Sequence, residues 1–145
     1  MVFQTDNSPG FYYNSGNSTT PNWILVGSSG GWKLNGNAGT NPAIYFLGTT
    51  DNQPLKFKVT NSHAGIIDPV NNNTGFGKQA LAQLTSGSSN TAYGSSVLAN
   101  VLTGHDNSAL GYLCGNLDGL GSENVELGVN SLQYNTSGTV NTSAG

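Results

Sequence analysis

The sequence has few of the residues on which charged, disulfide-bonded or nucleic-acid-binding proteins depend. Charged residues make up 8% of the 145 residues, there is one cysteine (Cys114), and arginine is absent. A single cysteine excludes an intrachain disulfide framework. A chain with a net charge of −3 and no arginine lacks the residue best suited to forked phosphate contacts. We therefore expect no nucleic-acid partner.

Long hydrophobic runs are also missing. No apolar stretch approaches the ~20 residues of a membrane span, so we expect no direct insertion into a membrane. The start MVFQTDNSPG does not have the apolar centre of a secretory signal peptide. We expect export to be encoded elsewhere or to occur by assembly into a particle.

The composition points to order through repetition. Hydrophobic residues are 35% of the chain, below the roughly 45–50% of typical globular proteins. Disordered chains of low hydrophobicity are usually charged or rich in proline, whereas this chain has 8% charged residues and 5 prolines. Instead, 21 glycines and 20 asparagines fill more than a quarter of it.

The second half is a tandem repeat with a step of 17 residues: NTGFGKQALAQLTSGSS, NTAYGSSVLANVLTGHD, NSALGYLCGNLDGLGSE and NVELGVNSLQYNTSGTV, followed by NTSAG. A fixed short period is typical of a solenoid, in which each unit is covered by its neighbours. Three positions recur in every block: an asparagine (Asn73, Asn90, Asn107, Asn124 and Asn141), a glycine four residues later (Gly77, Gly94, Gly111, Gly128 and Gly145), and a second glycine (Gly87, Gly104, Gly121 and Gly138).

We interpret each repeat as one β-coil, because asparagine, glycine and serine recur where a coil must turn. In NTAYG, Thr91 and Tyr93 should face one way and Ala92 and Gly94 the other. The small position (Gly75, Ala92 and Ala109) breaks at Glu126. A second short strand is predicted through Ala80–Leu81, Val97–Leu98 and Ser131–Leu132, with Gly115 replacing the leucine in the third coil.

The large side chains are predicted to meet other chains. About three apolar residues per coil should not enclose a core within one narrow coil, so an apolar stripe along the shaft would form an interface. The residues expected to pack there are Phe76, Tyr93, Leu110 and Leu127, together with Leu81, Leu98 and Leu132. The last block stops at Gly145 within a fifth coil, so we expect the chain to be a slice of a longer fibre.

The first seventy residues have a different pattern, without the 17-residue repeat. Short apolar runs at Phe11–Tyr13, Trp23–Val26, Ile44–Leu47 and Leu55–Val59 predict strands, and the last alternates with lysines as a half-buried strand does. We place a boundary near 68–72, which gives a small β module (1–70) followed by the repeats (71–145). The fold class predicted is all-β: stacked β-coil (β-roll or β-helix) repeats preceded by the small β module.

The blocks NTAYGSSVLANVLTG and NSALGYLCGNLDGLG resemble the Asn-Thr/Ser-Ala-x-Gly repeats of YadA-type trimeric autotransporter heads and of bacteriophage tail fibres. The strings VFQTDNSPGFYYNSGN, GWKLNGNAGTNP and FLGTTDNQPLKFKV are similar to modules that precede such repeats in tail-fibre and surface proteins of Bacteroidetes and their phages. The period of 17 is longer than in the usual adhesin repeat, and Glu126 and Gly115 depart from the pattern.

The resemblance implies left-handed β-rolls in an intertwined homotrimeric fibre with a role in attachment, and often a C-terminal self-cleaving chaperone beyond this segment. It implies a location on the virion as a tail fibre, or at the cell surface and extracellular as an adhesin. The implied partner besides other copies of the chain is a cell-surface glycan or a protein receptor.

Candidate catalysts are few, and we expect no enzyme activity, cofactor or metal site. His63 is expected at a strand end or turn. His105 and Asp106 are expected in a solvated turn, with side chains that diverge because they are adjacent. The carboxylates Asp106, Asp118, Glu123 and Glu126 recur at no fixed repeat position, unlike those of a calcium-binding β-roll.

Three other polar or aromatic features could have a structural role or a binding role. The asparagine column is expected to form a side-chain amide ladder, which is a structural use. Aromatic side chains of the first module could stack on sugars in a glycan-binding module, or could form its core: Tyr12, Tyr13, Trp23 and Trp32. A ladder of Thr74, Thr91, Ser108 and Thr142, interrupted by Val125, could bind ice or a crystal surface.

Overall fold

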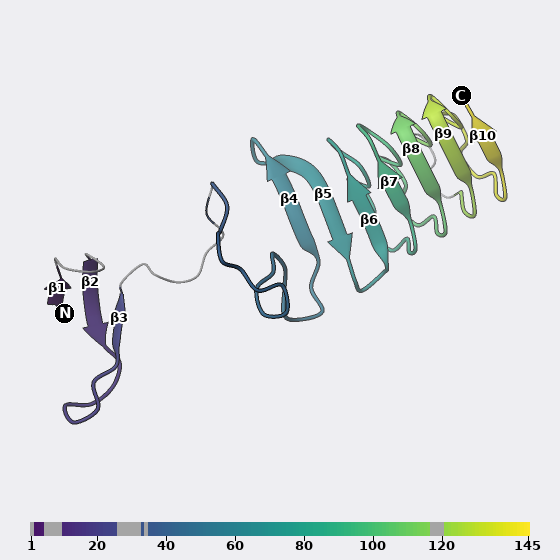
Figure 1. Cartoon of the computed structure of the whole chain (residues 1–145). Helices are drawn as coiled ribbons and strands as arrows, with labels where there is room; N and C mark the ends of the chain where they lie inside the picture. Colours follow the sequence, from purple (N-terminus) through teal and green to yellow (C-terminus); the bar gives the residue numbers. More distant parts are fainter. Residues whose placement is uncertain (1, 5–9, 26–32, 34, 117–120) are drawn as a thin grey trace. The chain divides into compact units, whose positions relative to one another are not determined.

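The structure is a computed structural model that describes residues 2–4, 10–25, 33, 35–116 and 121–145. The chain divides into two compact units, residues 1–47 and 48–145 (Figure 1). All regular elements in the described ranges are β-strands, which confirms the predicted all-β class. The described residues contain no helix that is long and apolar enough to cross a membrane.

The first unit holds a three-stranded antiparallel sheet in the order β1-β2-β3 (Val2–Gln4, Gly10–Asn14 and Trp23–Leu25). The Phe3 and Phe11 rings lie 4.9 Å apart across the β1–β2 pair. The strands predicted at Phe11–Tyr13 and Trp23–Val26 are therefore present, as parts of β2 and as β3, with Val26 outside the described residues. The strand predicted at Ile44–Leu47 is wrong, because these residues form an exposed turn and irregular backbone with no partner strand.

The second unit is built on a seven-stranded sheet in the order β10-β9-β8-β7-β6-β5-β4 (Figure 1). An antiparallel hairpin, β4 (Leu55–Val59) and β5 (Ser62–Asp68), pairs with β6 (Asn73–Phe76). One strand from each later coil then adds in parallel: β7 (Thr91–Tyr93), β8 (Ser108–Tyr112), β9 (Val125–Val129) and β10 (Thr142–Ala144). The repeats thus form a β-solenoid of about four turns.

The hairpin β4–β5 belongs to the same sheet as the repeats. The sequence predicts a boundary near 68–72, whereas the division between the two compact units falls between Leu47 and Gly48. The reason is the backbone pairing of β5 with β6, which runs from Gly65 opposite Phe76 to Asp68 opposite Asn73. The hairpin therefore extends the solenoid sheet by two strands.

The return segment of each coil is a turn and not the second strand that the sequence predicted. Leu81, Leu98 and Leu132 have left-handed backbone conformations, with φ of 54°, 47° and 46°, and Gly115 at the same position has φ of 51°. The amide of this residue donates to a carbonyl in the next coil, as in Leu98 to Cys114 at 2.9 Å. The left-handed residue reverses the chain and turns the leucine side chain inward.

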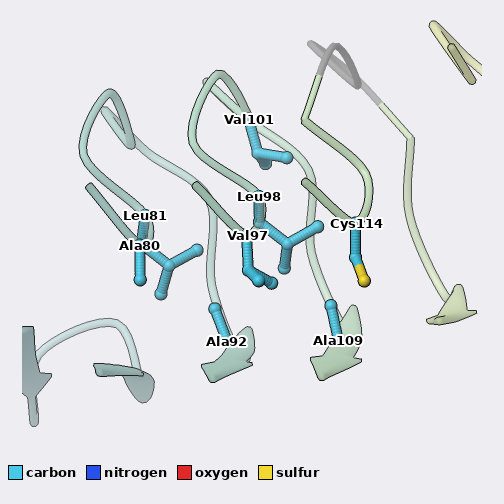
Figure 2. Packing of buried hydrophobic residues seen from close by; sticks show 8 residues of the cluster. All are labelled: Ala80, Leu81, Ala92, Val97, Leu98, Val101, Ala109 and Cys114. Atoms are coloured by element: carbon cyan, nitrogen blue, oxygen red, sulfur yellow. The ribbon is translucent and has the colours of Figure 1, made fainter. Parts of the chain in front are cut away.

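A hydrophobic core lies inside the solenoid (Figure 2). Leu98, Val97 and Val101 are fully buried there, and small residues of the strands face them. This corrects the expectation that one coil cannot enclose a core, because neighbouring coils share it along the stack. The cluster consists of Ala80, Leu81, Ala92, Val97, Leu98, Val101, Ala109 and Cys114.

The recurring glycines keep successive coils close together. Gly77, Gly94 and Gly111 have φ of 133°, 124° and 150°, which L side chains rarely adopt. A Cβ atom on each would also overlap the carbonyl oxygen of the equivalent glycine in the next coil. The glycine column therefore follows from both backbone conformation and strand stacking.

The two departures from the repeat, Glu126 and Gly115, compensate each other in volume. Glu126 stands where the three preceding coils have glycine or alanine, and 1% of it is exposed. A Cβ atom on Gly115 would lie 2.5 Å from Glu126 Oε2 and 2.6 Å from Leu98 Cδ2. The space that a leucine fills in the other coils is therefore occupied by the Glu126 side chain.

This arrangement predicts strong coupling between the two positions. Gly115→Leu should lower the free energy of unfolding by about 1–3 kcal/mol, as overpacking of a core does. The same substitution together with Glu126→Ala restores the usual pair of the repeat and should recover most of that loss. Urea unfolding of the two single variants and the double variant measures the coupling; costs that simply add would contradict the size compensation.

Candidate functional site: the outward face of the solenoid sheet

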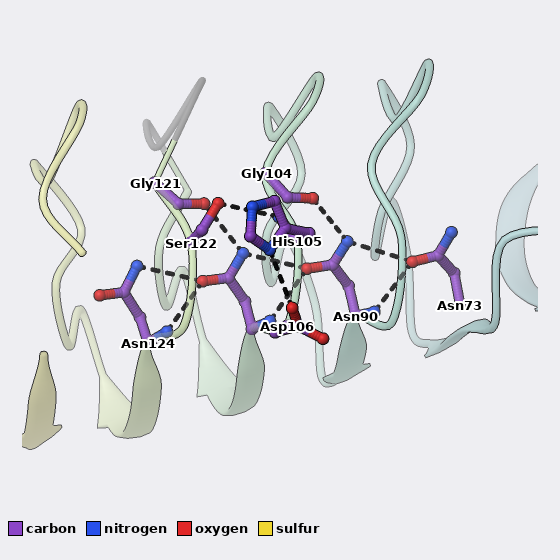
Figure 3. Close-up of polar contacts among 9 residues, drawn as sticks. Asn73, Asn90, Gly104, His105, Asp106, Gly121, Ser122 and Asn124 are labelled. Carbon is purple, nitrogen blue, oxygen red and sulfur yellow. Dashed lines mark hydrogen bonds and ion pairs between the residues drawn. The ribbon is translucent and has the colours of Figure 1, made fainter. Parts of the chain in front are cut away.

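A ladder of asparagine side chains holds the coils of the solenoid in register (Figure 3). The Oδ1 atom of Asn90 accepts hydrogen bonds from the backbone amide and the Nδ2 of Asn107, at 3.1 and 3.0 Å. Asn107 Nδ2 also donates to the carbonyl of Gly121 at 3.0 Å. The two bonds to Oδ1 recur in the pairs Asn73–Asn90, Asn107–Asn124 and Asn124–Asn141, and the bond to a glycine carbonyl recurs at Asn73, Asn90 and Asn124. The predicted amide ladder is confirmed.

Asp68 lies at the hairpin end of this ladder, opposite Asn73 in the β5–β6 register. Its carboxylate accepts bonds from the Val70 amide and from the amide and side chain of Asn71, at 3.0, 3.3 and 3.0 Å. Burial raises the pKa of Asp68, but these hydrogen bonds and one from the Asn73 side chain outweigh it and leave the pKa below its usual value. The ionised carboxylate therefore stabilises the first coil.

With the asparagines and small residues facing inward, alternate residues of the same strands face outward. Two columns of paired residues form what we call the outward face. The first column comprises Leu55, Ile67, Thr74, Thr91, Ser108, Val125 and Thr142. The second comprises Phe57, Gly65, Phe76, Tyr93, Leu110, Leu127 and Ala144.

The second column presents large apolar side chains to solvent. Exposed fractions are 43% for Tyr93, 54% for Leu110 and 52% for Leu127, while Phe76 is half-buried. Tyr112 and Val129, paired on β8 and β9, continue the exposed apolar surface beside this column. The large position of the repeat thus faces outward, as the sequence predicted.

Aromatic rings stack at the hairpin end of the outward face. The Phe76 ring centroid lies 5.8 Å from that of Tyr93 and 5.2 Å from that of Phe57. Gly65 lies between Phe57 and Phe76 in the register, and a Cβ atom there would lie 3.0 Å from Phe76 Cδ1. A glycine at this position lets the two rings meet. The alternation with Lys56 and Lys58 predicted Phe57 on the packed face of a half-buried strand, but it did not predict the contact with Phe76.

Charge is absent from both columns, since none of their members is Asp, Glu, Lys, Arg or His. An uncharged, exposed apolar band along a sheet is typical of an interaction surface. The chemistry available here is burial and stacking, because the columns hold no acid, base or thiol. The threonine ladder lies in the same face, with Thr74, Thr91, Ser108, Val125 and Thr142 in register.

The leucines of the turn have a different position from the one expected. Leu81 and Leu98 are buried in the core of the solenoid, and Leu132 is half-buried. The prediction that they pack with Phe76 at an interface between chains is therefore wrong for Leu81 and Leu98. The physical reason is the left-handed backbone at these residues, which turns their side chains inward.

The two histidines have separate surroundings. His105 and Asp106 lie in an exposed turn and their side chains meet, with Nδ1 of His105 donating to Oδ2 of Asp106 at 2.8 Å. The turn location is confirmed, but the expectation that these adjacent side chains diverge is wrong. His63 lies on β5 and its Nε2 donates to the Ala80 carbonyl at 2.8 Å.

Cys114 is a buried thiol of the solenoid core. Its Sγ lies 2.6 Å from the Gly128 carbonyl oxygen, to which it donates. Burial and, next, the negative charge of Glu126 raise the pKa of the Cys114 thiol. A protonated, buried thiol is a weak nucleophile, so Cys114 has a packing role. Within the described ranges no group of three or more His, Cys, Asp or Glu side chains could hold a metal ion; Asp118 lies outside these ranges.

The aromatic residues of the first unit lie on its small sheet. Tyr13 and Trp23 are 44% and 49% exposed, and Tyr12 is half-buried. In the strand register Tyr13 is opposite Ile24, while Trp23 is opposite Asn14, so Tyr13 and Trp23 belong to opposite faces of the sheet. Trp32 lies outside the described residues.

Comparison with known proteins does not identify a family: no family model, no curated protein and no solved structure matches the chain. The β-solenoid is therefore established by the chain's own strand pairing and repeat.

Removing one asparagine of the ladder should destabilise the solenoid. Asn107→Ala removes the Oδ1 atom that accepts a hydrogen bond from the Asn124 amide. It also removes the Nδ2 donor to the buried Asn90 Oδ1 and to the Gly121 carbonyl. At about 1–3 kcal/mol for each buried group left unsatisfied, we expect a loss of about 3 kcal/mol or more in thermal or urea unfolding. Asn100→Ala, at an exposed asparagine with one bond to Asn116, is the control; equal losses would contradict a special role of the ladder.

Acid should weaken the first coil through Asp68. Because its folded pKa is below the usual value of 3.8, the carboxylate contributes stability above that value, and this contribution is lost as pH falls through the folded pKa. Asp68→Asn should lower stability at neutral pH and reduce the difference in stability between pH 7 and about pH 3. Thermal unfolding across this range, with the exposed Asp51→Asn as control, measures the effect; an unchanged pH dependence in Asp68→Asn would contradict it.

Proposed function

We propose that this chain is a non-catalytic structural and adhesive segment of a homotrimeric fibre, which spaces or displays a receptor-binding region for attachment to a host or surface. The observation that supports it most is the outward face: an exposed, uncharged apolar band that runs along the solenoid sheet. A soluble rod with such a band gains stability by covering it with another copy.

The sheet face is the surface left for self-association, because the turn leucines are already buried within one chain. Leu81 and Leu98 have their partners inside the solenoid, whereas Tyr93, Leu110 and Leu127 remain exposed on the sheet. An interface would therefore use the sheet face alone. Identical chains placed in parallel around an axis would bring each large side chain next to its counterpart, since the column repeats every 17 residues.

The number three and the biological setting come from the resemblance of the repeats to those of trimeric adhesin heads and phage tail fibres. In this proposal the protein is located on a virion as part of a tail fibre, or at the cell surface as an adhesin. The partner at the tip is a cell-surface glycan or a protein receptor. The stack of coils, at about 4.8 Å for each strand, supplies length and stiffness.

The mass of the native particle in solution tests the proposal. Sedimentation or native mass spectrometry should give three chains for the wild type. Leu110→Asp with Leu127→Asp should dissociate the particle into folded single chains, because it places two charges in the apolar band. Val140→Asp is the matched control, since Val140 is 72% exposed but lies outside the two columns. A wild-type chain that is a folded monomer would contradict the trimer, and dissociation by Val140→Asp would contradict the assignment of the face.

A glycan-binding module is the second candidate, and the exposed Tyr13 and Trp23 of the first unit favour it. Aromatic rings with open faces can stack on the apolar side of a sugar ring. Because Tyr13 and Trp23 lie on opposite faces of the sheet, one of Tyr13→Ala and Trp23→Ala, but not both, should then remove binding on a glycan array without changing the native mass. An array on which the wild-type chain binds no sugar would exclude this candidate.

A further inference from the structure

A second surface of the solenoid unit is a pocket at the turn of the β4–β5 hairpin, away from the two columns of the outward face. The cavity has a volume of about 400 Å³, within the roughly 300–1,000 Å³ range of small-molecule sites. We call it the hairpin pocket, and its lining comprises Val59, Thr60, Ser62, His63, Ala64, Gly77 and Lys78.

Two side chains of the hairpin pocket, Lys78 and Ser62, can donate hydrogen bonds to a ligand, and its lining contains no acidic side chain. Lys78 is exposed, and among the described residues its ammonium group has no ion pair or side-chain hydrogen bond. The Ser62 hydroxyl is likewise exposed. His63 is fixed in place because its Nε2 donates to the Ala80 carbonyl, and Nδ1 of the neutral ring is an acceptor. The donor-bearing side chains that remain for a ligand in this cavity are those of Lys78 and Ser62.

The positive and most of the negative charges of the solenoid unit lie in different parts of the chain. The hairpin pocket lies in the part that holds the lysines. Lys56, Lys58 and Lys78 fall within 23 residues, in which the one acidic side chain is the buried Asp68, at the end of β5 away from the pocket. No lysine or arginine follows Lys78. The later coils carry only acidic charges: Asp106, Asp118, Glu123 and Glu126. An anion approaching the solenoid is therefore repelled by the later coils and attracted to the hairpin.

The backbone around the pocket is held by the fold. Thr60 and Asn61 form the hairpin turn with φ of 48° and 60°, and the Lys58 ammonium donates to Asn61 Oδ1 at 3.3 Å. The Gly77 amide donates to the Ala64 carbonyl at 2.9 Å. Because both walls are fixed by hydrogen bonds to each other, the cavity is already formed before a ligand enters.

We propose that the hairpin pocket binds an oxyanion group, a carboxylate or a sulfate, carried by a polysaccharide. Lys78 supplies the charge, and Ser62 supplies a directed hydrogen bond. The exposed Val59 offers an apolar wall for the sugar ring. The proposal is independent of the trimer, because none of these residues belongs to the outward face, but within the proposed function it names the class of receptor.

Titration of the ¹⁵N-labelled full chain by NMR tests the pocket, with sodium glucuronate and sodium sulfate as probes and glucose as the neutral comparison. We expect saturable shifts of the Ser62, Ala64, Gly77 and Lys78 amides with an anionic probe and none with glucose. Glucuronate acting alone assigns the group to a uronic acid, and sulfate acting alone assigns it to a sulfated sugar. Both outcomes support the proposal.

Two lysine variants distinguish the pocket from general charge attraction. Lys78→Ala should weaken binding about tenfold, as loss of a hydrogen bond to a charged group does. Lys56→Ala is the control, because Lys56 is also exposed but lines a different cavity. It should change binding less than twofold, because its charge is screened at that distance.

The proposal is overturned if neither anion gives saturable shifts, if glucose binds as well as glucuronate, or if the two lysine variants lose the same affinity. Failure here is distinguishable from failure of the fibre proposal. Lys78→Ala should leave the native mass unchanged, and the aspartate variants of the outward face should leave the anion affinity of the dissociated chain unchanged.

Discussion

The hydrogen bonds of the asparagine side chains across 17 residues are the interaction on which the solenoid depends. Each Oδ1 accepts both the amide and the Nδ2 of the next asparagine, so a coil that slipped by one residue would lose several buried bonds at once. Parallel strands of three to five residues have little stability alone. The ladder, which begins at the ionised Asp68, fixes their register and thereby determines what faces outward.

Residues at different positions of each repeat have three different structural roles. Asparagine provides register, small residues such as Ala92 and Ala109 leave room for the core, and large residues such as Tyr93 and Leu110 are left on the surface. The glycines allow the coils to approach one another. One chain therefore buries its own core but leaves apolar side chains exposed on the sheet. This explains why the proposed self-association uses the sheet face and does not require unfolding of the coil.

The two proposed binding regions differ in physical character. The outward face is long, uncharged and apolar, so it suits another copy of the same chain. The hairpin pocket is small and bears donors and positive charge, so it suits a compact anion. A fibre that uses the first for assembly keeps the second available for a ligand, because the residues of the two do not overlap.

Much of this could be predicted from the sequence: the 17-residue step, the asparagine ladder, the glycine positions and the outward Phe76, Tyr93, Leu110 and Leu127. These follow from alternation and recurrence, which are visible in any one chain. The inward leucines, the membership of β4 and β5 in the solenoid sheet, and the fit of Glu126 beside Gly115 were decided only by the tertiary structure. The physical reason is that periodicity identifies which residues stack, whereas the direction of a side chain in a turn depends on backbone φ, and neighbours outside the repeat depend on strand pairing.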